Sequence, residues 1–274
     1  MIDRLWRWLT DVEPDPKQTP KEGFGNVAAD PSIGLAVLAE PKRRRLCQKI
    51  RNYMVGYDLE DKIDLVERLL LRYALYVMDL QASEKHHHAV PYGLLDHSLE
   101  VASQVAARVE CTGFEISFEP CVTHRERPYW LYAAFVGALL HDVGKVLDLE
   151  VMTPDGKDRW DPLAEPLATF CLRNGLKETG PRYWRYRPGR GVRFHGWHGP
   201  MLFSLILPPK AIPYLGHRLA MVYDAMIAES LDHVPEDPQE LARRIAKVIH
   251  DADIESSKAE RSTDGSVPEG PAPE

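Results

Sequence analysis

One segment of the sequence constrains the fold more than any other, the run YWLYAAFVGALLHDVGKVL at residues 129–147. Its first twelve residues, 129–140, carry no charge and are too few to span a bilayer, so we expect them in the centre of a protein core. His141 and Asp142 follow directly. A buried carboxylate without a partner costs on the order of several kcal/mol, so the fold must supply a cation or strong donors beside this pair.

The composition is that of an ordinary globular protein. Of 274 residues, 44% are hydrophobic and 27% are charged. The net charge of −7 excludes a general attraction to nucleic acid, so any basic surface must be local. No secretory signal is present, and we expect a cytoplasmic protein. Without a C-x-x-C spacing, the cysteines are expected to be reduced and buried. They are Cys47, Cys111, Cys121 and Cys171.

Composition divides the chain into three segments. Residues 1–45 are irregular and rich in proline and glycine, apart from a short amphipathic helix at the start. Residues 46–255 carry apolar residues at three- and four-residue spacings, which predicts a helical domain. Residues 256–274 have the small, polar composition of a disordered tail or linker. We therefore expect one all-α domain with long loops and flexible termini.

The opening decapeptide MIDRLWRWLT places Ile2, Leu5, Trp6 and Leu9 on one helical face. A helix of this kind can make a peripheral membrane contact or bind a partner helix. We favour the simpler alternative, in which residues 1–10 pack on the body of the protein or are poorly ordered.

Periodicity within the central segment predicts individual helices. Pro128 suits the first turn of one of them, because proline lacks the N–H that a first turn leaves unpaired. Strand patterns are scarce, and FEISFEP at 114–120 is the best candidate. Helical spacing covers residues 49–81, where Asp58 or Asp61 is a plausible N-cap. Further helices are expected at about 94–109, 128–147, 211–231 and 238–254.

Polar residues suited to metal binding follow one another along these helices. GLLDHSLEVA places His97 near the start of a helix, and VIHDADIESS supplies Asp253 near the end of the last one. Between them, HDVGK adds Lys145, a point charge suited to a phosphate oxygen. Imidazole and carboxylate ligands favour Mn²⁺, Fe²⁺ or Zn²⁺. The order H…HD…D therefore predicts a divalent-metal site.

These segments resemble the HD-domain superfamily of metal-dependent phosphohydrolases. HHHAVPYGLLDHSLEVA joined to LLHDVGKV resembles, more narrowly, the N-terminal domain of the MobH-type relaxases, which process DNA for conjugative transfer. The resemblance covers about residues 60–255. It implies an all-α HD fold and one or two divalent ions, with manganese or iron favoured over zinc. It also implies DNA nicking at a transfer origin, on single-stranded or nicked DNA, with conjugation-machinery proteins as partners.

The resemblance implies roles for individual residues. His97, His141 and Asp253 are expected as metal ligands. Asp142 is expected as a bridging metal ligand that takes part in catalysis, and Lys145 as a catalytic contact to the substrate phosphate. Full relaxases of this type usually carry a further C-terminal domain, so we expect a fragment or a shorter natural form.

Loop histidines extend the expected ligand set. His88 is our choice from the triplet 86–88, because it lies closest to the helix that follows. For a second metal, RFHGWHGP offers His195 and His198, and His217 competes for that role. One position departs from the family pattern: a Gly-Gly pair commonly precedes the Leu-Leu, where this chain has Tyr-Gly at 92–93.

The segment PRYWRYRPGRGVRFHGWHG is basic, aromatic and free of acidic residues. Arginines contact phosphates and aromatic rings stack on unpaired bases, so it is a candidate nucleic-acid surface. The alternative is that these arginines pair with carboxylates elsewhere in the protein. We expect nucleic-acid contacts from Arg182, Arg185, Arg187, Arg190, Arg193 and Trp197.

The sequence also bears on other functions. An ATP-driven motor needs G-x-x-x-x-G-K-[ST], but Lys145 and Lys157, which follow glycines, are followed by valine and aspartate. A phosphohydrolase or 3′–5′ exonuclease on nucleotides or nucleic acid is the alternative enzyme. A non-catalytic, metal-stabilised module that binds DNA or a partner is the alternative outside enzymes. The nucleophile stays open between water and a histidine or tyrosine near the metal.

Overall fold

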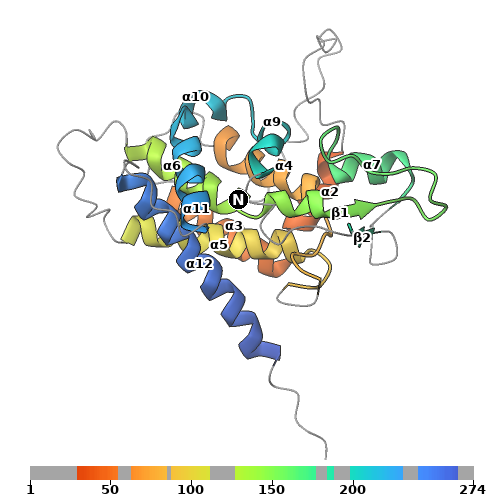
Figure 1. The fold of residues 1–274 in the computed structure, drawn as a ribbon, viewed down its shortest axis with the longest axis horizontal. Coiled ribbons are helices and arrows are strands. Elements are labelled where there is room, and N and C mark those ends of the chain that lie inside the picture. The colour runs from red at the N-terminus through yellow and green to blue at the C-terminus, as the bar shows by residue number, and fades with distance from the viewer. Residues whose placement is uncertain are drawn as a thin grey trace, which may run out of the picture.

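The fold is known from a computed structural model of the chain. The structure describes residues 30–54, 63–84, 88–111, 127–176, 184–187, 198–230 and 240–264. Within this part the protein is mostly helical, with one small two-stranded sheet (Figure 1). The expected all-α class is therefore confirmed, while its assignment to the HD type stays a prediction.

Helices make up most of the described residues. The α-helices are α2 (Pro31–Leu38), α3 (Pro41–Met54), α4 (Arg68–Val77), α5 (Gly93–Cys111), α6 (Arg127–Leu140), α7 (Leu167–Arg173), α9 (Phe203–Ile206), α10 (Ala211–Leu215), α11 (Arg218–Ser230) and α12 (Glu240–Asp264). A π-helix, η1 (Ile63–Glu67), and two 3₁₀ helices, η2 (Val143–Asp148) and η3 (Gly199–Leu202), complete them. Strands β1 (Leu149–Val151) and β2 (Trp184–Tyr186) pair antiparallel.

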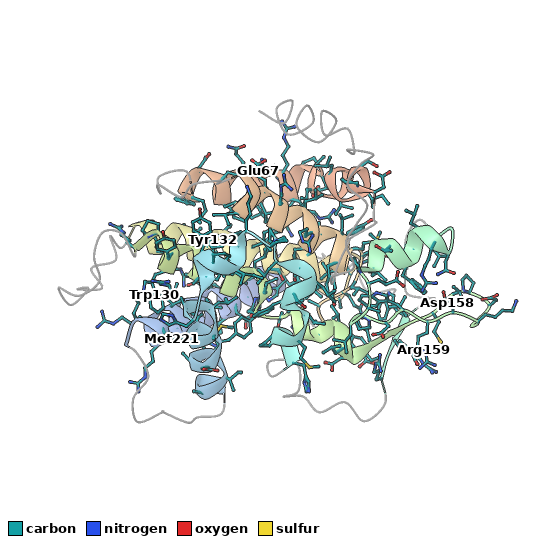
Figure 2. The ribbon with its side chains drawn as sticks, turned by 90° about the horizontal axis from the view of Figure 1, so that it is seen from above. Glu67, Trp130, Tyr132, Asp158, Arg159 and Met221 are labelled. Carbon is teal, nitrogen blue, oxygen red and sulfur yellow. The ribbon has the colours of Figure 1, made fainter. Side chains whose placement is uncertain are left out.

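Helix α6 forms the centre of the core, as its uncharged sequence predicts. Every residue from Trp130 to Leu140 is buried. Helices α5, α10, α11 and α12 pack around it (Figure 1). The hydroxyl of Tyr132 donates to the carbonyl of Leu65 at 2.7 Å, so even its polar atom is satisfied inside the core. In Figure 2, Trp130 and Tyr132 lie far from Asp158 and Arg159, which follow β1.

The same segment passes a test of length and composition for a membrane span. Among the described residues, Arg127–Asp148 is long and apolar enough to cross a bilayer. Most of it is buried inside the protein, and the central helix of a protein core meets the same criterion. This finding is therefore weak support for a membrane-spanning segment.

The central helix ends earlier than expected. It stops at Leu140 instead of continuing to about Leu147, and His141 and Asp142 form a turn that leads into η2. The buried hydroxyl of Tyr223 on α11 donates to the carbonyl of Leu140. This bond satisfies a carbonyl that the helix end leaves without an intrahelical partner. His141 and Asp142 therefore lie in the turn that follows α6 and not on the helix itself.

Two further helices differ from their expected bounds. The helix expected over 211–231 is interrupted at Gly216, whose φ of +51° ends α10 before α11 begins. Helix α12 continues to Asp264, beyond the expected domain end at 255. Ser256, placed in the expected tail, is only 1% exposed. The last turns of α12 run out from the body (Figure 1).

Regular structure begins before the expected boundary at residue 46. Helix α2 starts after Asp30, whose carboxylate accepts a hydrogen bond from the Ser32 backbone N–H at 2.9 Å. Cys47 and Cys171 are free and buried, as expected. The opening helix at 1–10, the candidate strand at 114–120 and Cys121 lie outside the described residues, as does the side chain of Cys111.

Candidate metal centre

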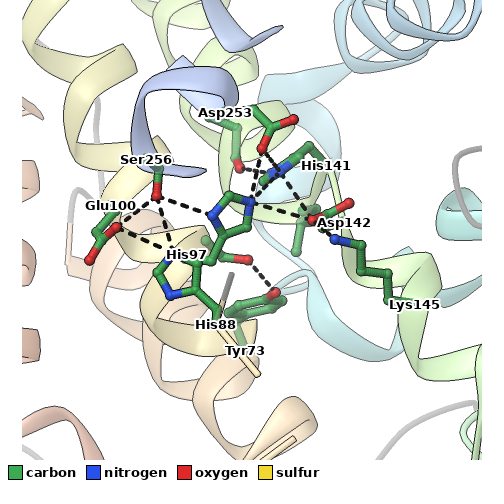
Figure 3. Close-up of polar contacts among 12 residues, drawn as sticks. Tyr73, His88, His97, Glu100, His141, Asp142, Lys145, Asp253 and Ser256 are labelled. Atoms are coloured by element: carbon green, nitrogen blue, oxygen red, sulfur yellow. Dashed lines mark hydrogen bonds and ion pairs between the residues drawn. The ribbon is translucent and has the colours of Figure 1, made fainter. Parts of the chain in front are cut away.

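Residues from three parts of the chain meet at one point (Figure 3). His97 comes from α5, Asp253 from α12, and the His141–Asp142 pair from the turn after α6. The His97 nitrogen Nε2 lies 3.2 Å from Nε2 of His141 and 3.1 Å from Oδ1 of Asp253. Oδ2 of Asp142 lies 3.4 Å from Nε2 of His97 and 3.5 Å from Nε2 of His141. The structure therefore brings all four predicted core ligands together.

The donor atoms suit a divalent ion. One atom each of His97, His141 and Asp253 lies within 4.8 Å of the others, a spacing that could hold a metal. The His141 nitrogen Nδ1 is 2.8 Å from the carbonyl oxygen of Ala138. A carbonyl only accepts, so Nδ1 carries the proton and Nε2 presents its lone pair to the cluster. Imidazole nitrogens with carboxylate oxygens fit manganese, iron or zinc, and the residues present match the expected group.

Charge at the centre is balanced by close opposite charges. Burial alone lowers the pKa of His97, but hydrogen bonds to Asp142 and Asp253 outweigh it and raise that pKa to about 9. Burial alone raises the pKa of Asp142, but Lys145 and His141 hold it well below its ordinary value. The pKa of Asp253 is also lowered, because His97 outweighs burial. Both carboxylates are thus ionised at neutral pH, the form that binds a cation.

Lys145 lies at the edge of the ligand cluster. Its ammonium group pairs with Oδ2 of Asp142, three residues earlier. Burial lowers the pKa of Lys145, but the Asp142 carboxylate outweighs it and the pKa is raised. The lysine therefore stays charged beside the ligands, where it can bind an anionic oxygen next to a metal ion.

Two residues that the sequence did not single out complete the surroundings of His97. Ser256 Oγ lies 3.1 Å from His97 Nδ1 and donates to Oε2 of Glu100 at 2.7 Å. Glu100 follows His97 by three residues on α5, and Ser256 follows Asp253 by three on α12. This i, i+3 spacing is the signal that could have identified them, because such residues share a helix face.

His88 lies near the centre but faces away from the ligand cluster. Its ring is 4.9 Å from that of His97, between centroids. Its Nε2 atom points to Ser256 Oγ at 3.5 Å and to Glu100 Oε2 at 3.7 Å. Figure 3 shows His88 on the opposite side of His97 from Asp142. In this arrangement His88 contacts Ser256 and Glu100, which lie behind His97, and its role as a ligand stays a prediction.

Comparison with known families identifies the chain. Residues 28–269 match the family TraI_2, described as "Putative helicase". The chain belongs to this family. Because TraI_2 is associated with conjugative transfer, the expected link to conjugation is supported at this level. No curated protein and no solved structure matches the chain.

His195, His198 and His217 were expected as candidates for a second metal site, and the structure describes two of them, His198 and His217. His198 is partly buried at the start of η3. The next residue, Gly199, packs close to η2: a Cβ there would lie 3.5 Å from Val143 Cγ1. His217 is exposed, in the turn between α10 and α11. Neither belongs to the three-residue metal group found in the described part of the chain, and His195 lies outside that part.

The Tyr-Gly pair that departs from the expected Gly-Gly has a physical explanation. A Cβ on Gly93 would lie 2.0 Å from the His88 carbonyl oxygen, so this position requires glycine. Tyr92 adopts a φ of +65°, which is costly for a bulky residue. The Arg43 guanidinium lies over its ring at 4.3 Å, and Arg43 Nε donates to Asp96 at 2.6 Å. Position 93 thus requires the glycine of the family pattern, whereas position 92 accommodates a tyrosine that packs against Arg43.

Two of the arginines expected to contact nucleic acid lie in the described residues. Arg185 on β2 pairs with Glu150 on β1, with Nε 2.5 Å from Oε2. Arg187 Nε donates to the Leu149 carbonyl at 3.1 Å. Pairing with a carboxylate therefore holds for Arg185, although its side chain is 62% exposed and accessible to a ligand. The remaining candidates, Arg182, Arg190, Arg193 and Trp197, lie outside the described residues.

Proposed function

We propose that this TraI_2 protein is a metal-dependent phosphodiesterase of the HD type that nicks DNA at a transfer origin during conjugation. The meeting of His97, His141, Asp142 and Asp253 around one point carries the proposal. Two imidazoles and two ionised carboxylates at these distances form a set of ligands that suits a divalent ion. The family's association with conjugative transfer supports DNA as the substrate.

The proposed metal is a single divalent ion or a pair, manganese or iron in preference to zinc. His97, His141 and Asp253 would hold it, with Asp142 as the further carboxylate. When bound, a divalent ion activates water and neutralises charge on a phosphoryl oxygen. The cluster's two imidazoles and two carboxylates provide the ligand types that this chemistry needs.

The chain's own residues supply orientation and charge. The hydrogen bond from His141 Nδ1 to Ala138 fixes the imidazole ring, so its Nε2 keeps one direction. Asp142 holds the Lys145 ammonium beside the cluster. Lys145 then binds a non-bridging oxygen of the scissile phosphate and stabilises the charge that develops there.

Arginines place the nucleic acid. Arg185 lies on β2 and Arg187 directly after it. Strand β2 pairs with β1, which directly follows η2, the helix that contains Lys145. A phosphate backbone bound there would run toward the ligand cluster along η2. Cleavage is proposed rather than ATP-driven unwinding, despite the family's description, because these 274 residues contain no G-x-x-x-x-G-K-[ST] motif.

A nicking assay tests the proposal. Purified protein is incubated with Mn²⁺ and a supercoiled plasmid carrying its transfer origin, with a plasmid lacking that origin as the control. We expect open circles only from the first plasmid, abolished by a chelator and by His141→Ala. Mononucleotides released from a linear DNA with free 3′ ends, without open circles from the plasmid, would instead identify an exonuclease. Metal and DNA binding without cleavage would identify a non-catalytic module, and either outcome contradicts the proposal.

A further inference from the structure

One face of α12 contacts both nitrogens of the His97 ring. Asp253 Oδ1 lies 3.1 Å from Nε2, and Ser256 Oγ lies 3.1 Å from Nδ1 (Figure 3). Asp253 and Ser256 are three residues apart, so they lie on the same face of the helix. The imidazole therefore lies across that face with a polar atom opposite each nitrogen.

The contacts of the Ser256 hydroxyl determine to which neighbour it donates and from which it accepts a hydrogen bond. Its hydroxyl is buried and lies 2.7 Å from Oε2 of Glu100. An ionised carboxylate only accepts, so the hydroxyl proton points to Glu100. The serine oxygen can then accept the proton on Nδ1 of His97 at 3.1 Å, the nearer of its two imidazole neighbours, since Nε2 of His88 lies 3.5 Å away. The bonds run in one direction, from the imidazole N–H to the hydroxyl and from the hydroxyl to the carboxylate.

Glu100 is itself held from another helix. Lys42 on α3 pairs with its second oxygen, Oε1, at 2.8 Å. The two contacts use different oxygens, so Lys42 does not compete with Ser256. Helices α3, α5 and α12 are thus joined through Glu100 directly behind a metal-ligand candidate.

We propose that Ser256 and Glu100 are positioning residues for the metal centre. When a metal displaces the proton on Nε2, they keep the remaining proton of His97 on Nδ1, so that the lone pair of Nε2 faces the metal. A histidine that binds a metal through Nε2 must carry its proton on Nδ1, and an acceptor there orients the ring. This inference rests on the metal centre of the proposed function, but it assigns residues that the H…HD…D pattern does not contain.

Two isosteric variants test the serine. Ser256→Thr keeps the hydroxyl and Ser256→Val removes it, while both add the same bulk at this buried position. The dissociation constant for Zn²⁺ is measured by competition with a chelating dye. We expect the threonine variant to bind about 10-fold more tightly than the valine variant, the range that such outer contacts contribute. Glu100→Gln, at a less buried position, is expected to weaken binding in the same direction.

A matched control and a second readout separate this role from a general loss of structure. Ser257→Ala, at the next position on α12, should bind Zn²⁺ like the wild type. Nitrogen-15 NMR of the Zn²⁺-loaded protein should show a slowly exchanging Nδ1–H on His97 in the threonine variant and a rapidly exchanging one in the valine variant.

The possible failures are distinguishable. Equal Zn²⁺ affinity in the threonine and valine variants, with a wild type that binds Zn²⁺, would overturn the positioning role and leave the metal centre intact. A wild type without affinity for Zn²⁺, Mn²⁺ or Fe²⁺ would overturn the metal centre and the positioning role together.

Discussion

The ammonium group of Lys145 pairs with Oδ2 of Asp142, the same oxygen that lies 3.4 Å from Nε2 of His97. One carboxylate oxygen thus serves a lysine and a candidate metal-binding imidazole. The lysine supplies part of the positive charge that this buried carboxylate needs. A metal ion bound by the proposed ligands would therefore share Asp142 with Lys145.

Replacing the lysine should separate metal binding from catalysis. We expect Lys145→Ala to bind Mn²⁺ at least as tightly as the wild type, because a competing cation is removed from Asp142. Nicking should fall by about 10²-fold, the loss typical of removing one charged contact to the transition state. Lys157→Ala is the control, since that side chain is 84% exposed and pairs with Asp155 on a surface turn. Unchanged nicking in Lys145→Ala would contradict the role of Lys145.

The hydroxyl that ends α6 should matter for the metal as well as for stability. Tyr223→Phe leaves the buried Leu140 carbonyl without its donor, which should cost about 1–3 kcal/mol in the free energy of unfolding. Because His141 follows Leu140 directly, we also expect metal affinity to fall about 10-fold. Tyr132→Phe removes a comparable buried bond to Leu65 and should lower stability alone. Denaturant unfolding and metal titration of both variants check this, and equal metal affinities would refute the link.

Gly93 should tolerate no side chain. A Cβ there would lie 2.0 Å from the His88 carbonyl oxygen, a backbone atom that cannot turn away. We expect Gly93→Ala to lower the free energy of unfolding by about 1–3 kcal/mol or more. Gly199→Ala is the matched control, since the nearest atom to its Cβ would lie 3.5 Å away. Similar unfolding midpoints for the two variants in denaturant would show that the loop around His88 is less constrained than the structure indicates.

Arg185 should contribute to DNA binding through charge alone. We expect Arg185→Ala to weaken binding to all sequences alike and to reduce the slope of log affinity against log salt by about one. Arg173→Ala, which removes a surface arginine paired with Asp158 and Glu165, is the control. Fluorescence anisotropy at several salt concentrations measures both. An unchanged slope for Arg185→Ala would assign this arginine to its bond with Glu150.

Sequence patterns predicted the elements that local spacing determines. Helix α5 spans Gly93–Cys111 against an expected 94–109, because its apolar residues mark one face. The end of α6 could not be predicted in this way. The apolar pattern continues through Val143 and Val146, and the donor that ends the helix, Tyr223, is 83 residues from Leu140.

In the candidate site, too, some residues could be predicted from the sequence and others depend on contacts between distant segments. The four core ligands were predicted because their order along the chain matches a known pattern, and the structure brings them together. Glu100 and Ser256 are ordinary polar residues until α5 and α12 pack, since 156 positions separate them. His88 was chosen for its nearness in sequence, but the chain turns there with a φ of +55° and directs its Nε2 to Glu100.

The central claim is that His97, His141, Asp142 and Asp253 hold a divalent metal. The most direct test is the metal content of the wild type and of the double variant His141→Ala/Asp142→Ala. Both proteins are purified without added metal, and their metal content is measured by inductively coupled plasma mass spectrometry. We predict about one to two manganese, iron or zinc ions per wild-type chain. The double variant should contain none. A wild type without metal, and without uptake of Mn²⁺ or Fe²⁺ on titration, would contradict the account.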